Sequence, residues 1–181
     1  PSDFPCIAMR RYFASPWVEA QHRHLSVLAS RSTSRALDLG CGKGRHAMLL
    51  MEMGFEVTAI DCDTVSLEYL RQRGGGKLTM IQMDLEVEDV STASLGHFDA
   101  ILVVNFACRS LLPKLPKLLK EDGILIFESW AEGNEKYAMA KDAKALQGLL
   151  RPNELLDALT EHCTVLSYAH GLQEDYEGRD C

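Results

Sequence analysis

The sequence predicts an α/β fold in which helices cover both faces of a mainly parallel, doubly wound sheet. From residue 35 onward, short apolar runs alternate with amphipathic stretches of helical period. The apolar runs are nearly continuous, which is typical of strands buried on both faces. Repeated units of this kind imply parallel strands joined by crossover helices.

Local signals place the elements in order. Gly54 ends one predicted helix, Asp63 or Thr64 caps the next, and Pro152 suits the first turn of the last. Strands are expected at residues 35–39, 56–60, 77–82, 98–104, 124–128 and 163–169, and helices at residues 17–29, 44–53, 64–73, 108–120 and 152–161. Residues 170–181 resemble a hairpin turn without its second strand. A final antiparallel strand is therefore expected to be missing at the C-terminal end, which leaves an unpaired edge unless the chain continues.

Composition limits the function. A chain of 181 residues, 46% hydrophobic, has the size of one compact domain. We expect residues 1–34 to form an N-terminal helical arm or cap and residues 35–181 the main domain. The net charge of -7 argues against a nucleic-acid partner, because phosphate neutralisation needs clustered Lys and Arg. The arm is locally basic, through Arg10 and Arg11 among others.

Six scattered cysteines without a C-x-x-C pair indicate free thiols in a reducing compartment. A cytoplasmic protein is expected, with no membrane span, no signal peptide and no metal site. The sequence leaves the oligomeric state open.

A glycine-rich turn follows the first predicted strand, in the stretch ALDLGCGKGRHA. Gly40, Gly42 and Gly44 alternate with other residues, and Asp38 precedes them by two positions. A dinucleotide turn would carry Gly or Ala where this chain has Arg45. Pyrophosphate favours a helix start without a nearby acid, whereas Asp38 suits a ligand with an ammonium group or orients the turn.

The turn and the acids that follow the next strands resemble the class I S-adenosylmethionine-dependent methyltransferases. Asp61 in VTAIDCD and Asp84 in MIQMDLE end the second and third predicted strands, and FDAILVVNFACRSL fits the family's fourth-strand motif. The resemblance implies the Rossmann-like methyltransferase fold over residues 35–170 and S-adenosylmethionine as cofactor. Asp61 would hold the ribose hydroxyls and Asp84, with Leu85 beside it, the adenine amino group. The cofactor residues that it implies are Asp38, Gly40, Cys41, Gly42, Gly44, Asp61, Cys62, Asp84, Leu85, Val104 and Asn105.

NFACRSLLPKL, FESWAEGN and GLLRPNELLDAL resemble the small tellurite-resistance-like methyltransferases, although residues 106–108 depart from that pattern. The expected reaction is methyl transfer to a small molecule: a thiol, an oxyanion or metalloid, or a small organic acid. A thiolate or an anion arrives already nucleophilic, whereas an alcohol or amine needs a base. The sequence does not choose among these acceptors.

Candidate acceptor residues flank the cofactor positions. Arg109 suits a substrate carboxylate or oxyanion, or pairs on a helix surface, and His46 is a candidate base or a packed residue of the helix start. Tyr12 and Trp17 of the arm are expected to line the acceptor pocket. The resemblance implies that Trp130 and Glu128, at the end of the fifth strand, also point into this pocket. The arm closes over this pocket or merely covers the sheet, and residues 130–148 are a candidate lid. A lesser hypothesis is that Cys41, Cys62 and Cys108, which follow parallel strands, together capture a metalloid or a metal.

Two other functions remain open at this level. One is a catalytically silent module that binds S-adenosylmethionine, and the other is a Rossmann NAD(P) oxidoreductase, which Arg45 and Asp84 disfavour.

Overall fold

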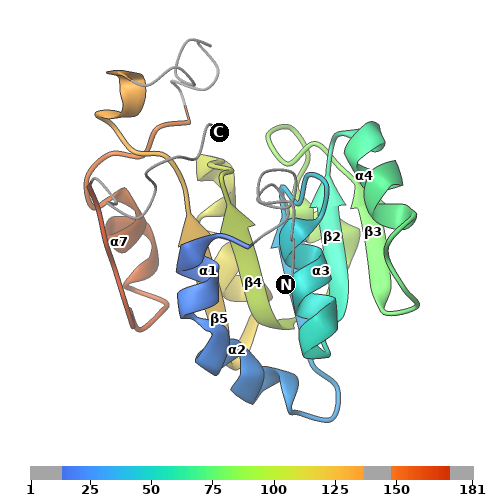
Figure 1. Cartoon of the computed structure of the whole chain (residues 1–181). Coiled ribbons are helices and arrows are strands. Elements are labelled where there is room, and N and C mark those ends of the chain that lie inside the picture. Colours follow the sequence, from blue (N-terminus) through green and yellow to red (C-terminus); the bar gives the residue numbers. More distant parts are fainter. Residues whose placement is uncertain (1–13, 137–147, 172–181) are drawn as a thin grey trace, which may run out of the picture.

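The computed structural model describes residues 14–136 and 148–171 of the chain. Five strands form one sheet in the order β3-β2-β1-β4-β5, and every pairing is parallel (Figure 1). The predicted parallel α/β fold is therefore confirmed. The strands are β1 (Arg35–Leu39), β2 (Glu56–Asp61), β3 (Leu78–Gln82), β4 (Phe98–Val104) and β5 (Leu119–Glu128).

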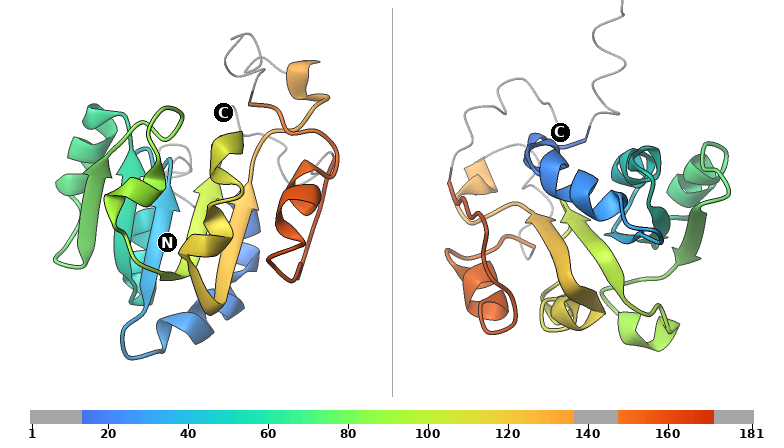
Figure 2. Two further views of the ribbon diagram at one scale, coloured as in Figure 1. Left: turned by 180° about the vertical axis from the view of Figure 1, so that it is seen from behind. Right: turned by 90° about the horizontal axis from the view of Figure 1, so that it is seen from below.

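Helices cover both faces of the sheet (Figure 2). Four of them, α1 to α4, lie on one face, while α5, α7 and the 3-10 turns at residues 90–93 and 109–111 lie on the other. The right-handed crossovers that parallel strands require determine the face on which each connecting helix lies. The helices are α1 (Pro16–Ala20), α2 (His22–Ala29), α3 (Arg45–Met53), α4 (Thr64–Arg71), α5 (Leu115–Leu118) and α7 (Glu154–Leu159), and the 3-10 turns are η2 (Val90–Ala93), η3 (Arg109–Leu111) and η4 (Asn134–Lys136).

Strand β4 shows how the sheet separates two cores. All seven of its residues are buried. Leu102 and Val104 point to the face of α1 to α4, whereas Ile101 and Val103 point to the opposite face. Successive side chains of a strand alternate between faces, and each fully buried aliphatic side chain contributes about 1.5–3 kcal/mol.

Two predicted helices differ from the observed ones. The expected helix over 17–29 is broken at Gln21 into α1 and α2. The expected helix over 108–120 is replaced by η3 and the four-residue α5, and β5 starts as early as Leu119. Pro113 and Pro116 explain this difference, because proline lacks the N–H that a continuing helix needs.

The expected strand over 163–169 is wrong. These residues form no strand, and Val165, Leu166 and Tyr168 are exposed. Among the described residues, β5 pairs only with β4, so segment 163–169 has no neighbour that would satisfy its backbone. The hydroxyl of Tyr168 accepts a hydrogen bond from the backbone N–H of Asn153 at 3.2 Å, next to α7.

A buried carboxylate fastens the amino edge of the sheet. Asp99 in β4 is 2% exposed and accepts hydrogen bonds from the backbone N–H of Arg35 at 2.9 Å, Lys120 Nζ at 2.8 Å and Arg31 at 3.2 Å. Burial acts to raise the pKa of Asp99, but these donors outweigh it and hold that pKa below its usual value. The network ties β1, β4 and β5 together at the end opposite the predicted site.

The strand order reverses between β1 and β4. The chain leaves β1 toward β2 and leaves β4 toward β5, so their loops diverge at the carboxyl edge. In open α/β sheets this divergence opens the crevice in which ligands bind.

Candidate functional site

The carboxyl edge of the sheet brings the predicted cofactor residues together. The glycine turn follows β1, Asp61 ends β2, Asp84 comes two residues after β3, and Val104 ends β4. Their strands are neighbours in the sheet, so residues as far apart in the sequence as Gly40 and Val104 share one edge (Figure 1). Whether this edge holds a cofactor stays a prediction.

The glycine turn folds tightly onto β2. The backbone N–H groups of Gly40 and Cys41 both donate to the carbonyl of Ile60, at 2.9 and 3.1 Å, and Gly44 N–H donates to the Cys41 carbonyl at 2.9 Å. Gly42 and Gly44 have φ of +50° and +79°, a region that side chains disfavour.

The two glycines serve different purposes. A Cβ on Gly44 would lie 2.4 Å from a methyl group of buried Leu70, so this glycine lets α4 pack closely. Among the residues that the structure describes, a Cβ on Gly42 would meet no atom within 4 Å. Gly42 therefore leaves open space above the turn, where a ligand can approach the backbone.

Asp61 holds the turn from the side. Its carboxylate accepts from Gly42 N–H at 2.7 Å through one oxygen and from Asp63 N–H at 2.9 Å through the other. Each carboxylate oxygen has a second lone pair, so Asp61 can also accept from the hydroxyls of a bound ribose. The carboxylate is half-buried and lies beside the open space above Gly42.

Asp38 is a buried acid with an incomplete set of partners. Its side chain is 1% exposed, and Oδ2 has no hydrogen-bond partner among the described residues. Burial raises the pKa of Asp38 to about 7, and Asp61 adds to the rise, whereas the N–H of Ala47 and the charge of Arg45 act in the other direction. An unpartnered buried carboxylate oxygen is costly unless a ligand donor completes it.

The remaining cofactor positions lie around these two acids. Oδ1 of Asp84 accepts from Glu86 N–H at 3.0 Å, and Leu85 is buried. Asn105 has φ of +56°, a left-handed conformation that asparagine tolerates better than most residues, and its N–H donates to the Glu128 carbonyl at 2.8 Å.

The three thiols at this edge are not equivalent. Cys41 is buried, and burial together with Asp38 and Asp61 raises the pKa of its thiol. Cys62 is exposed, and the Cys108 thiol donates to the Leu85 carbonyl at 3.3 Å. Among the residues that the structure describes, no group of three His, Cys, Asp or Glu side chains could hold a metal ion.

A chain of hydrogen bonds links the start of α3, the residue before α1 and the end of β5. The backbone N–H of Ser15 donates to His46 Nε2 at 3.1 Å, and the Ser15 hydroxyl donates to Glu128 Oε2. Ser15 also caps α1, because its hydroxyl oxygen accepts from Val18 N–H at 3.2 Å. We call Ser15, His46 and Glu128 the α1 anchor.

His46, a predicted candidate base, is occupied by this anchor. It is 4% exposed, and burial, with the charge of Arg45, lowers its pKa to about 3. The ring is therefore neutral at pH 7, and its proton resides on Nδ1 because Nε2 accepts from Ser15. These contacts favour a positioning role for His46 over proton abstraction.

Arg109, a predicted anion ligand, is bound to a carboxylate of its own chain. Its Nε and one terminal nitrogen contact the two oxygens of Glu154 at 2.5 and 3.0 Å, and the same terminal nitrogen donates to the Leu149 carbonyl at 2.7 Å. Glu154 is 8% exposed, and chiefly the hydrogen bonds from Arg109 lower its pKa to about 2. A substrate anion would have to displace this bidentate pair.

The structure describes two of the three aromatic candidates for the acceptor pocket, Trp17 and Trp130. Trp17 is half-buried and packs against the core on the α1 to α4 face, so the described part of the arm covers the sheet. Trp130 is half-buried, and its carbonyl accepts from Leu150 N–H at 3.0 Å. Tyr12, the basic residues Arg10 and Arg11, and most of the candidate lid lie outside the described residues.

Sequence reasoning missed Ser15 and Glu154. Ser15 stands directly before Pro16, a signal for a helix cap that could have been read. Its partners lie 31 and 113 residues away, and no local pattern indicates them. Glu154 carries no comparable signal.

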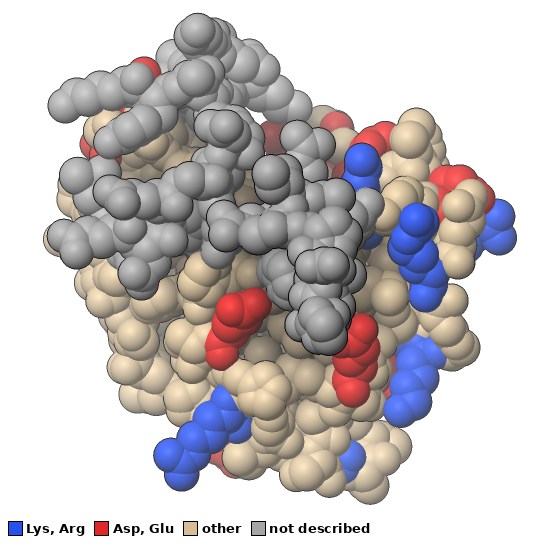
Figure 3. Space-filling view, viewed as in Figure 1, with Lys and Arg blue, Asp and Glu red and all other residues tan. Residues whose placement is uncertain are grey.

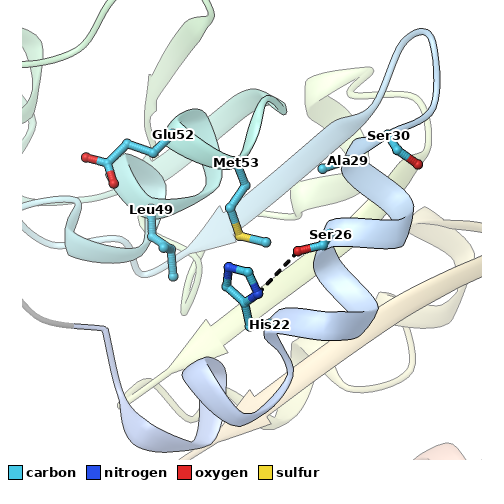
Figure 4. Close-up of a pocket in the computed structure, with 7 residues that line it drawn as sticks. All are labelled: His22, Ser26, Ala29, Ser30, Leu49, Glu52 and Met53. Atoms are coloured by element: carbon cyan, nitrogen blue, oxygen red, sulfur yellow. Dashed lines mark hydrogen bonds between the residues drawn. The ribbon is translucent and has the colours of Figure 1, made fainter.

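A cavity of about 480 Å³ opens away from the carboxyl edge, between α2 and the last turns of α3 (Figure 4). His22 and Ser26, which are hydrogen-bonded at 3.2 Å, lie on one wall, and Leu49, Glu52 and Met53 lie on the other. None of the predicted cofactor residues lines it.

On the face shown in Figure 3, Lys and Arg side chains are scattered along the side that carries α3 and α4, with Asp and Glu among them. No helix in the described part of the chain is long and apolar enough to cross a membrane. The predictions of no nucleic-acid partner and of a cytoplasmic location remain predictions.

Comparisons with known proteins agree with this architecture. A family model described as a methyltransferase domain matches residues 36–123. Malonyl-acyl-carrier-protein O-methyltransferase of Salmonella typhimurium is 27% identical over 145 residues, which cover 74% of this chain and 55% of that protein. The chain spans 41 to 55% of the length of the first curated relatives that it matches.

Solved structures show the same fold. A TehB-like S-adenosylmethionine-dependent methyltransferase from Corynebacterium glutamicum superposes with a TM-score of 0.52 at 24% identity, over 70% of this chain and 72% of that one. CalS10 from Micromonospora echinaspora, an amino pentose methyltransferase solved with S-adenosylmethionine bound, gives 0.51 at 23% identity, over 68% and 55%.

Proposed function

We propose that this chain, which carries a class I methyltransferase domain, binds S-adenosylmethionine at the carboxyl edge and transfers its methyl group to a small molecule. The observation that carries this proposal is the unpartnered oxygen of buried Asp38 beside the glycine turn. The family match and the fold support the same activity.

The residues at this edge fit the cofactor. Asp38 offers a buried acceptor for an ammonium group, and the space above Gly42 lets a chain pass close to the backbone. Asp61 offers paired carboxylate oxygens for two ribose hydroxyls. Asp84, with buried Leu85, would hold the adenine end.

When bound, S-adenosylmethionine supplies an electrophilic methyl group on a positively charged sulfur. The contribution of the chain is to hold both reactants in line and to exclude water. Asp61 fixes the turn through Gly42, and the left-handed Asn105 directs the chain away from the end of β4. Neither role requires a residue to change its protonation state.

Calorimetry with S-adenosylhomocysteine, the product of methyl transfer, tests the proposal. We expect binding to the wild-type chain and weaker binding to Asp38→Asn, because the amide removes the negative charge but keeps the size of the side chain. The exposed acid Glu56 at the amino edge provides a matched control, Glu56→Gln. Absence of binding to the wild type, or stabilisation by NADH instead, would refute the proposal.

A further inference from the structure

We propose that Asp38 couples cofactor binding to the release of one proton, so that the affinity for S-adenosylmethionine rises from acidic to neutral pH. The inference rests on the proposed function and describes how the same site is regulated. Three features carry it: the burial of the carboxyl group, its unpartnered oxygen, and the arrangement of charges around it.

Asp38 lies in the middle of the sheet and is enclosed on all sides. Its neighbours in register, Ala59 on β2 and Leu102 on β4, are fully buried apolar residues. The side chain is 1% exposed, and the N–H of Ala47 in α3 donates to its carboxyl group. Oδ2 has no hydrogen-bond partner within the described ranges. Burial with an incomplete set of donors penalises the carboxylate, so the unliganded chain favours the protonated acid.

Two charged groups act on Asp38 from neighbouring elements. Arg45, the first residue of α3, favours the carboxylate through its charge, but it is not a hydrogen-bond partner of Oδ2 in the described part of the chain. Asp61 at the end of β2 favours the protonated acid, because two negative charges repel each other. Burial is the largest effect and raises the pKa of Asp38 to about 7. The carboxyl group is therefore mostly protonated at pH 6 and mostly ionised at pH 8.

The other titratable groups of the glycine turn and of the start of α3 do not compete with Asp38 in this pH range. Burial raises the pKa of the Cys41 thiol above its ordinary value, so this thiol keeps its proton. Burial lowers the pKa of His46 to about 3, so this ring stays neutral. The ammonium group of Lys43 lies over the ring of Tyr69, 5.6 Å from its centroid. Asp38 is therefore the group whose charge changes between pH 6 and pH 8.

A bound ammonium group changes the balance at Asp38. It brings a positive charge and N–H donors, and it binds the carboxylate more tightly than the protonated acid. The O–H bond of the acid breaks, its electron pair stays on the carboxyl oxygen, and the proton passes to water or buffer, while the ammonium group keeps its own hydrogens. Binding thus lowers the pKa of Asp38, and by linkage the ligand binds more tightly as pH rises toward about 7 and no more tightly above it.

Calorimetry on the full chain counts the released proton. S-adenosylhomocysteine is titrated at pH 6 and at pH 8, each time in two buffers with small and large heats of ionisation, such as phosphate and imidazole at pH 6 or phosphate and Tris at pH 8. A pKa of about 7 predicts release of about 0.9 proton at pH 6 and about 0.1 at pH 8, with about tenfold tighter binding at pH 8. The nucleoside 5′-methylthioadenosine, which has no ammonium group, should bind without releasing a proton.

Variants assign the proton to Asp38. Asp38→Asn keeps the size of the side chain but cannot titrate, so its weaker binding of S-adenosylhomocysteine should be the same at pH 6 and pH 8 and should release no proton. Asp61→Asn removes a charge that raises the pKa of Asp38, so the pH at which the affinity levels off should move down. Glu56→Gln, at the amino edge, should keep the wild-type profile. Urea denaturation shows which variants are folded, and the counts on the wild type do not depend on them.

The outcomes separate this inference from the proposed function. Absence of S-adenosylhomocysteine binding at both pH values refutes the proposed function itself. Binding with equal affinity at pH 6 and pH 8 and with no proton released overturns the coupling alone. Proton release that persists in Asp38→Asn overturns the role of Asp38, and equal proton release with 5′-methylthioadenosine overturns the role of the ammonium group.

Discussion

Two glycines of the same turn are expected to respond differently to alanine. A Cβ at either position carries the cost of a left-handed residue, about 1–2 kcal/mol. At Gly44 the new methyl also lies 2.4 Å from fully buried Leu70, and this overpacking adds about 1–3 kcal/mol. Gly44→Ala should therefore lower the free energy of unfolding by about 2–5 kcal/mol, and Gly42→Ala by about 1–2 kcal/mol.

Gly42→Ala, the less destabilised variant, should lose more affinity for the ligand than Gly44→Ala. The methyl group of Gly42→Ala projects into the open space above the turn, where the proposed cofactor passes, so the affinity for S-adenosylhomocysteine should fall at least about tenfold. Urea denaturation measures the stability of both variants, and calorimetry measures the binding by each folded variant. Wild-type affinity in Gly42→Ala would show that Gly42 does not face the ligand. Equal losses of stability in the two variants would contradict the close packing of Gly44 against Leu70.

Three further predictions concern acids with distinct partners. Asp61→Asn keeps one backbone hydrogen bond but removes the charge that would bind the ribose, so calorimetry should show at least about tenfold weaker S-adenosylhomocysteine binding; unchanged affinity contradicts the ribose role. The pKa of Asp99 is lower in the folded chain, so the stability that its carboxylate contributes is present above its ordinary pKa and is lost as pH falls through the lowered value. Asp99→Asn should lower the free energy of unfolding by about 1–3 kcal/mol at pH 7 and should flatten the acid limb of a plot of that free energy, measured with urea, against pH. An acid limb like that of the wild type would refute this prediction. Glu154→Gln releases Arg109 and should lower the free energy of unfolding by about 1–2 kcal/mol, a figure discounted because the Arg109 side chain is 43% exposed. Binding of phenylacetate, a simple carboxylate, to this variant would show that the pair with Glu154 keeps anions from Arg109. Absence of phenylacetate binding would show that Arg109 does not face the acceptor.

The sheet was predictable because its signal is local. Strands β1, β2 and β4 are apolar runs with short, well-marked boundaries, and the structure places their ends within one residue of the expected positions. The acids and glycines that end these runs share an edge as a consequence of parallel topology. The arrangement of the carboxyl edge therefore followed from chain order alone.

What sequence reasoning missed depends on contacts between distant residues. Segment 163–169 has a strand-like composition, but a strand needs a neighbour, and none pairs with it among the described residues. Ser15 meets Glu128 across 113 positions, and Arg109 meets Glu154 across 45. These pairs decide which predicted residues are available to a substrate, and a single sequence carries no record of them.

The most direct test of the proposed function is a crystal structure of the chain with S-adenosylhomocysteine. The account predicts that the ribose hydroxyls contact Asp61, that the amino group completes the unpartnered oxygen of Asp38, and that the sulfur lies beside Val104 and Asn105. Electron density for the ligand elsewhere, for example in the cavity between α2 and α3, or contacts that bypass both acids, would contradict it.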